Sequence, residues 1–194
     1  MKNLIKKFGV FAAIIIISII STVGAMGQTS TSHSSTDKKV VADFEKRAKK
    51  YIKLRDKAAR RIPTPSKDAT PEQVAAYKTS LQKAVEKRRE HAKQGEIFTP
   101  AAAELIRRLI KANFKGYDRA ELRQTVLEAD TKGIPLKVNF EYPESKELIE
   151  MSPALLLTLH QIPPQLRYRY IGRSLVLLDR DTALIVDFMK EALP

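Results

Sequence analysis

The hydrophobic spacing of this chain changes once, and this change limits the fold more than any other feature. From Lys38 to about residue 131, apolar residues recur every three or four positions, which is the spacing of amphipathic helices. From Leu136 onward they alternate with polar residues, which is typical of half-buried strands. The sequence therefore predicts an α+β fold: an N-terminal helical hairpin, two further helices, and a C-terminal antiparallel β meander of three to four strands.

Prolines, glycines and capping residues mark the ends of the expected helices. The prolines within 62–65 end the first helix, and Thr70 caps the start of the second. Because only a short proline-rich turn joins these two helices, we expect them to pack antiparallel as a hairpin. The second helix is expected to run to Lys93, with Gly95 as its left-handed stop. The four expected helices span residues 38–61, 70–93, 99–116 and 118–133.

Alternating segments in the last third of the chain predict the meander. Gly172 and Arg173 form a tight turn between two of the strands, and Asp179 and Asp181 are interpreted as formers of the next turn. A short apolar helix is expected over 154–159, between the first and second strands. The expected strands are 136–142, 166–171, 174–178 and 183–188.

The N-terminus has the composition of an export signal. Three lysines precede an uncharged apolar run over residues 8–20, and small residues follow where a signal peptidase cleaves. We expect cleavage after Ala25, with Gly27 as a second position. The alternative is an uncleaved anchor through residues 8–27. In both cases the later residues are expected outside the cytoplasm, in the periplasm or the extracellular space, because the lysines favour the inner side.

The expected domain organisation follows from these segments. Residues 1–25 form the signal peptide or anchor, and residues 26–37, rich in Ser and Thr, form a flexible spacer. A single domain is expected over 38–194, with its helices in 38–131 and its sheet part in 134–194.

Positive charge is concentrated in the expected hairpin. Residues 38–93 contain 18 Lys and Arg against 7 Asp and Glu, whereas residues 94–194 contain 14 of each. This excess predicts contact with an anionic lipid, an acidic envelope polymer or an acidic protein, although a merely solvated helix surface is the alternative. Nucleic acid is not an expected partner, because export separates the protein from nucleic acid in the cell and few aromatic residues accompany the charges. The candidate anion-contact residues are Lys46, Lys49, Lys53, Lys57, Lys87 and Arg88.

Several kinds of chemistry are excluded or unsupported. The chain has no cysteine, which rules out disulfides, thiolate metal sites and a cysteine nucleophile. The glycines of the expected domain are too far apart for a phosphate-binding loop or a dinucleotide-binding turn. The three histidines of the chain, His33, His91 and His160, do not have the spacing of zinc ligands. We therefore expect no metal and no cofactor.

The last three expected strands carry a resemblance to known families. The run Tyr168–Asp179, followed by Leu184–Asp187, resembles the terminal hairpin of several small exported bacterial families. One of them is the periplasmic family linked to nickel and cobalt homeostasis. The resemblance implies a cell-envelope setting and a β meander, and it places no metal ligand or catalytic residue on any position.

These observations leave three hypotheses about function. We favour a non-enzymatic envelope protein whose basic helical face binds an anionic or protein partner. The alternative is a cofactor-free exported hydrolase with its active site between helices and sheet. A periplasmic metal-handling or stress protein is the third, and it rests on the resemblance alone. The candidate groups for the hydrolase are Glu104, Asp130, His160 and Asp187.

Overall fold

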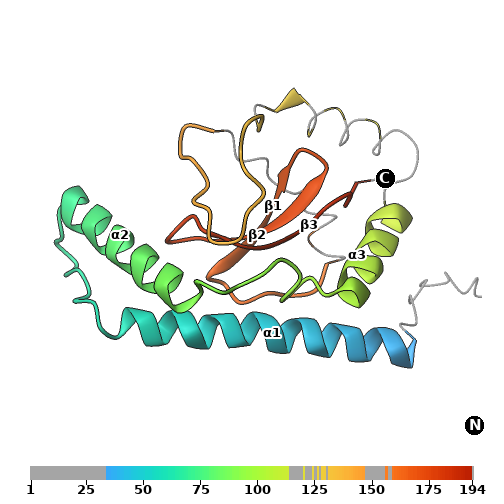
Figure 1. The fold of residues 1–194 in the computed structure, drawn as a ribbon, viewed down its shortest axis with the longest axis horizontal. Coiled ribbons are helices and arrows are strands. Elements are labelled where there is room, and N and C mark those ends of the chain that lie inside the picture. The colour runs from blue at the N-terminus through green and yellow to red at the C-terminus, as the bar shows by residue number, and fades with distance from the viewer. Residues whose placement is uncertain are drawn as a thin grey trace, which may run out of the picture. The chain divides into compact units, whose positions relative to one another are not determined.

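The computed structural model describes residues 34–113, 131–146 and 159–193, together with the single residues 120, 124, 126, 128, 129 and 156. Within these residues the fold is α+β, as predicted, with three helices followed by a three-stranded antiparallel sheet (Figure 1). The expected helices over 118–133 and 154–159 lie mostly outside the described residues. The elements are α1 Ser35–Ala59, α2 Pro71–Arg88, α3 Pro100–Asn113, β1 Leu166–Ile171, β2 Ser174–Asp179 and β3 Ile185–Met189.

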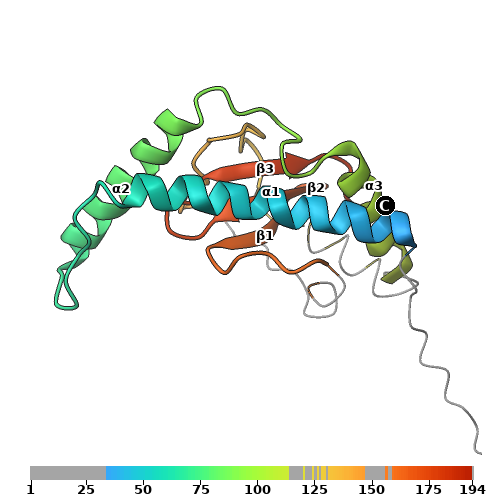
Figure 2. The same cartoon turned by 90° about the horizontal axis from the view of Figure 1, so that it is seen from below.

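The long helix α1 lies across one face of the sheet, which Figure 2 shows from the helix side. It begins at Ser35 rather than at Lys38, because the Ser34 hydroxyl accepts a hydrogen bond from the backbone N–H of Asp37 over 3.1 Å. Its buried residues recur at helical spacing, so one side of the helix faces the core. They are Phe44, Ala48, Tyr51, Arg55 and Ala58.

Helix α2 begins where the sequence predicts it but ends earlier. Thr70 and Gln73 form the expected capping box. The helix stops at Arg88 instead of Lys93, because Arg89 leaves the helical conformation and places its side chain in the interior, where it is 6% exposed. Gly95 does have a positive φ, of 86°, but it lies in the loop before α3 and does not end the helix. Residues 71–76 are all exposed, and α2 diverges from the sheet at this end (Figure 1).

The sheet has a core on each side. On the side of the helices, Tyr168, Leu175 and Leu177 pack with residues of α1 and α3. On the other side, Val176 and Leu178 pack against a second apolar cluster that includes residues from the irregular segment 134–142. Successive strand residues point to opposite faces, so both faces of the central strand β2 are buried.

A bulge in β3 interrupts this alternation. Leu177 pairs with Asp187 while Leu178 pairs with Ile185, so Val186 is the extra residue. Val186 belongs to the cluster on the helix side, and the neighbouring Asp187 binds backbone groups on that side as well. The bulge therefore brings an acidic side chain to the helix side of the sheet.

The fourth strand expected over 136–142 is absent from the described structure. This segment makes one isolated bridge, between Glu141 and Leu184. Within the segment, a turn precedes this bridge: the N–H of Phe140 donates to the carbonyl of Lys137 over 3.2 Å. Asn139 has a φ of 62°, a left-handed conformation that a continuous strand does not contain.

Candidate anion-binding surface

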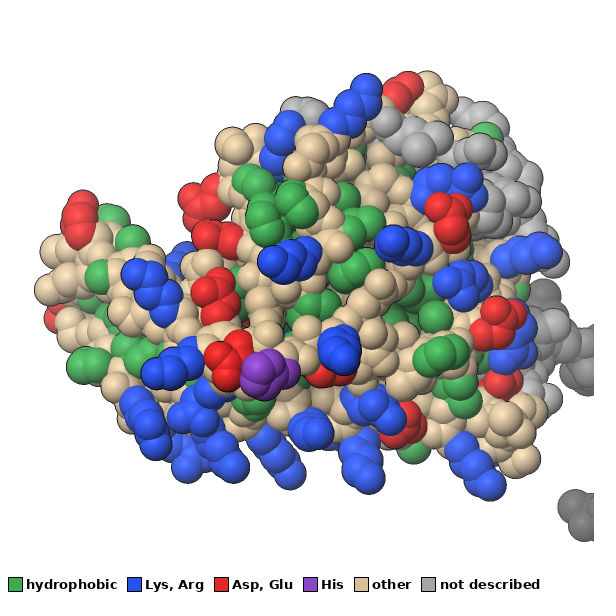
Figure 3. Space-filling model, viewed as in Figure 1, with side chains coloured by type: hydrophobic (Ala, Val, Ile, Leu, Met, Phe, Trp, Pro, Cys, Tyr) green, Lys and Arg blue, Asp and Glu red, His purple; other side chains and the backbone are tan. Residues whose placement is uncertain are grey.

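The outward side of α1 carries a row of lysines. Lys46, Lys49, Lys53 and Lys57 are exposed and follow one another at intervals of three or four residues, so they share one side of the helix. We call these four residues the α1 basic face. It lies opposite the buried residues of α1, which point to the sheet. Figure 3 shows Lys and Arg side chains gathered along the lower edge of the molecule, where Figure 1 places α1.

Acidic residues cancel little of this charge. Lys49 contacts Glu45 over 3.7 Å, and both side chains are more than one-third exposed, so water screens the attraction. Among the residues that the structure describes, no carboxylate lies within ion-pair distance of Lys46, Lys53 or Lys57. The α1 basic face therefore presents its positive charge to solvent.

The two candidate residues on α2 do not join this row. Arg88 lines a groove between α1 and the loop after α2, where it is accompanied by Arg47 and Lys50 of α1. Lys87 lines a different groove, between α2 and residues 136–139. All six expected residues are exposed, but the structure distributes them over three surfaces. Lys50, which the sequence analysis did not select, lies beside the α1 basic face, and its spacing of four residues from Lys46 is the signal that could have identified it.

A buried network fixes α1 to the sheet. Asp179 at the end of β2 accepts hydrogen bonds on Oδ2 from the Tyr51 hydroxyl over 2.7 Å and from Nε of Arg55 over 2.8 Å. Arg55 also pairs with Asp181. Oδ1 of Asp179 accepts from the N–H groups of Asp181 and Thr182, which confirms its expected role in the turn. Burial and the negative charge of Asp179 raise the pKa of the Tyr51 phenol well above its ordinary value.

A second buried arginine connects the end of α2 to β3 and to the segment 134–142. Nε of Arg89 donates to Oδ1 of Asn139 over 3.1 Å, and its Nη2 donates to the carbonyl of Val186 over 2.7 Å. Its guanidinium group lies over the Tyr51 ring, 4.9 Å from the centroid. Burial lowers the pKa of Arg89, and the negative charge of Glu96 partly opposes this effect. Arg89 therefore has a structural role, because it joins the end of α2 to β3, to the segment 134–142 and to α1.

Asp187 holds the loop between α2 and α3. Its Oδ1 accepts from the N–H of Gly95 and of its neighbour Phe188, and its Oδ2 accepts from the N–H groups of Ile97 and Phe98, over 2.6–2.9 Å. Burial raises the pKa of this carboxyl group, and the four backbone donors oppose the rise. With every oxygen already bonded twice, Asp187 has a structural role.

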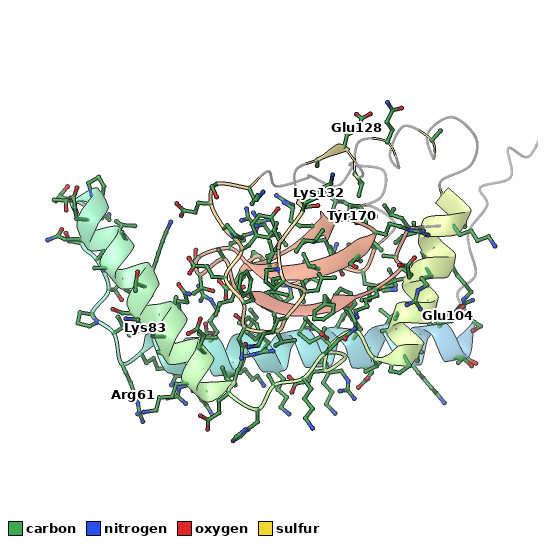
Figure 4. The ribbon with its side chains drawn as sticks, turned by 45° about the horizontal axis from the view of Figure 1, so that its top comes forward. Arg61, Lys83, Glu104, Glu128, Lys132 and Tyr170 are labelled. Atoms are coloured by element: carbon green, nitrogen blue, oxygen red, sulfur yellow. The ribbon has the colours of Figure 1, made fainter. Side chains whose placement is uncertain are left out.

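The groups considered for a hydrolase lie apart in the described structure. Glu104 is exposed on α3, at the end of α1 opposite α2 (Figure 4). His160 is half-buried beside the Phe44 ring, with the ring centroids 6.5 Å apart, and Asp130 lies outside the described residues. Side chains of the core fill the space between helices and sheet. No observation on the described residues supports an active site there.

Among the described residues, no group of three or more His, Cys, Asp or Glu side chains is placed to hold a metal ion. None of the helices described combines the length and the apolar composition that crossing a membrane requires.

No family model matches this chain, and comparisons with curated proteins and with solved structures return no match.

Proposed function

We propose that this protein is a non-enzymatic module of the cell envelope, exported by its N-terminal segment, which binds an extended anionic surface through the α1 basic face. The observation that carries the proposal is the row of exposed lysines on one side of a single helix, nearly free of acidic partners. From Lys46 to Lys57 the row extends over about 16 Å, given the rise of an α-helix. A row of this length suits anionic lipid head groups or a linear acidic polymer better than a compact ligand.

The attraction between the lysines and an anionic surface determines the expected strength of such binding. A lysine near an anionic lipid surface contributes about 1 kcal/mol, and this attraction decays within a Debye length of about 10 Å at moderate salt. Four lysines on one side of a helix can act together, since a flat surface reaches all of them at once. Binding of this kind should be reversible and should weaken strongly as salt concentration rises.

The rest of the domain supports the proposal as a rigid platform. Tyr51 and Arg55 lie on the side of α1 opposite the lysines and are bonded to Asp179 in the sheet. The lysine row is therefore held straight before any partner binds, which reduces the ordering cost of association.

The test is a binding assay of the exported chain, residues 26–194, with lipid vesicles that differ only in anionic lipid content. The apolar run over residues 8–20 is left out because it would bind lipid by itself. We expect binding only to anionic vesicles, and weaker binding at high salt. Replacing the four lysines of the α1 basic face by Gln should lower affinity about a hundredfold or more.

A matched control removes the same charge elsewhere. Lys78, Lys83, Lys132 and Lys137 are exposed, and Figure 4 shows Lys83 on α2 and Lys132 on the far side of the sheet from α1. Changing these four residues to Gln should alter affinity less than about fivefold. Equal losses in the two variants, or affinity that does not respond to salt, would contradict the proposal.

A further inference from the structure

A groove separates α1 from the loop that follows α2, and it is distinct from the α1 basic face. We call it the inter-helix groove. Its volume is about 380 Å³, within the range typical of small-molecule sites. Lys50 contributes to it from α1, and Arg88 contributes from the last turn of α2. Cationic side chains from two helices therefore border one cavity.

Most charges around the groove are already paired. Arg47 binds Asp43 over 2.6 Å, and Arg89 lies 3.7 Å from Glu96. Lys50 and Arg88 differ, because no carboxylate of the described residues lies within ion-pair distance of either. Lys50 and Arg88 are thus two cations without an ion-pair partner among the described residues, and together they can match the two charges of a phosphate monoester dianion. The carboxylate of Glu90, which contacts His91, remains a negative charge on the rim.

The remaining lining favours a particular kind of ligand. Leu54 and Ile97 provide apolar surface, and the rims carry the carboxylates of Glu90 and Glu96. Carboxylates accept hydrogen bonds from hydroxyl groups, whereas they repel a second anionic group. We infer that the inter-helix groove binds a phosphate ester of a small hydroxylated molecule, with the phosphate between Lys50 and Arg88.

The floor of the groove is formed before any ligand binds. Tyr51 and Arg89 lie there with the guanidinium over the phenol ring, and both are bonded to the sheet, through Asp179 and through the carbonyl of Val186. Fixed walls allow binding without reorganisation of the core. The inference does not depend on the α1 basic face, since the ligand is a soluble molecule and two cations outside that face, Lys50 and Arg88, bind it.

The experiment is calorimetric titration of the full-length chain with glycerol phosphate and, separately, with inorganic phosphate. Sodium chloride at the same ionic strength serves as the reference. We expect saturable binding of glycerol phosphate at one site, tighter than that of inorganic phosphate. The double variant Lys50→Gln/Arg88→Gln should weaken it at least about tenfold, because two charge-assisted contacts are lost.

Two further variants make the outcome decisive. Lys78→Gln/Lys83→Gln removes the same charge from exposed positions of α2 outside both surfaces and should leave the affinity within about twofold. The charge-conserving variant Lys50→Arg/Arg88→Lys should retain most of it. Absence of saturable binding, or equal weakening by both Gln pairs, would overturn the inference. A short-chain phosphatidic acid that stays in solution distinguishes a lipid source of the phosphate: if it competes with glycerol phosphate and loses affinity in Lys50→Gln/Arg88→Gln, the same groove takes a lipid head group.

Discussion

Arg55 of α1 donates from Nε to Oδ2 of Asp179 at the end of β2 over 2.8 Å, and both side chains are buried. This ion pair joins α1 to the central strand of the sheet. A buried pair of this kind stabilises little relative to apolar side chains, but removing one partner leaves the other charged group buried and unpaired. The pair therefore fixes how α1 is placed on the sheet.

Arg55→Met should be strongly destabilising. Asp179 would remain buried without its cationic partner, and the free energy of unfolding should fall by about 3–5 kcal/mol in urea denaturation. Arg47→Met is the matched control, because it removes an arginine of the same helix whose ion pair with Asp43 is exposed. A cost below about 1 kcal/mol is expected there. Similar losses for the two variants would show that the buried pair has no special role.

Two buried tyrosines should respond in opposite ways to loss of the hydroxyl group. Tyr51 donates to Asp179, so Tyr51→Phe should cost about 1.5–3 kcal/mol of unfolding free energy, the range for hydrogen bonds to charged groups. The Tyr170 hydroxyl is buried and has no hydrogen-bond partner in the described structure. Tyr170→Phe, at the site labelled in Figure 4, should be neutral or stabilising by up to about 1 kcal/mol. Thermal melting of both variants tests this, and a destabilised Tyr170→Phe would contradict it.

Asp187→Asn should loosen the loop between α2 and α3. The amide group that replaces one carboxylate oxygen cannot accept, so two of the four backbone N–H donors lose their acceptor. Since each buried unpaired donor costs about 1–3 kcal/mol, we expect a total loss of about 2–6 kcal/mol in urea denaturation. Hydrogen exchange should accelerate at the two amides left without an acceptor, which are either Ile97 and Phe98 or Gly95 and Phe188. The exposed Glu104→Gln provides the control, with a change below about 0.5 kcal/mol, and a variant that keeps slow exchange at all four amides would refute this role for Asp187.

Alkaline pH should unfold the domain cooperatively. Burial raises the pKa of Tyr51, Tyr168 and Tyr170 above the ordinary tyrosine value of 10.0. Because the folded-state values lie above the unfolded one, the contribution of these groups to stability is complete below about pH 10 and is lost as pH rises further. Phenolate absorbance from these residues should therefore appear together with loss of the circular dichroism signal. Gradual ionisation of all the tyrosines before unfolding would contradict this expectation.

The order of elements could be predicted because each signal is local. The Thr70 capping box and the alternation of 166–171 depend on residues that are close in sequence, and the structure confirms both. The end of α2 could not be predicted in this way. It depends on Arg89, which turns inward to reach Val186 and Asn139, and these partners are distant in sequence.

The absence of the expected fourth strand could not be predicted for the same reason, since it depends on a contact between residues distant in sequence. Alternating residues in 136–142 favour a strand, but Asn139 takes a left-handed conformation and donates from Nδ2 to the carbonyl of Arg89 over 2.6 Å. The sequence does contain one clear sign of a long-range contact: Arg55 is a charged residue within the otherwise apolar stripe of the first helix. Such a position predicts a buried acidic partner, but which acid it is depends on the fold.

The contacts of β2 and β3 also determine when the domain can become complete during synthesis. Asp179 and Asp187 bind groups that precede them by about 90 to 130 residues, in α1 and in the loop before α3. The ribosome makes α1 and this loop long before either carboxylate exists. Until the last hairpin emerges, α1 has no sheet on which to bury Phe44 and Tyr51, and its arginine at position 55 has no anion. Chains shortened at the C-terminal end should therefore depend on chaperones to remain in solution, even with every helix intact.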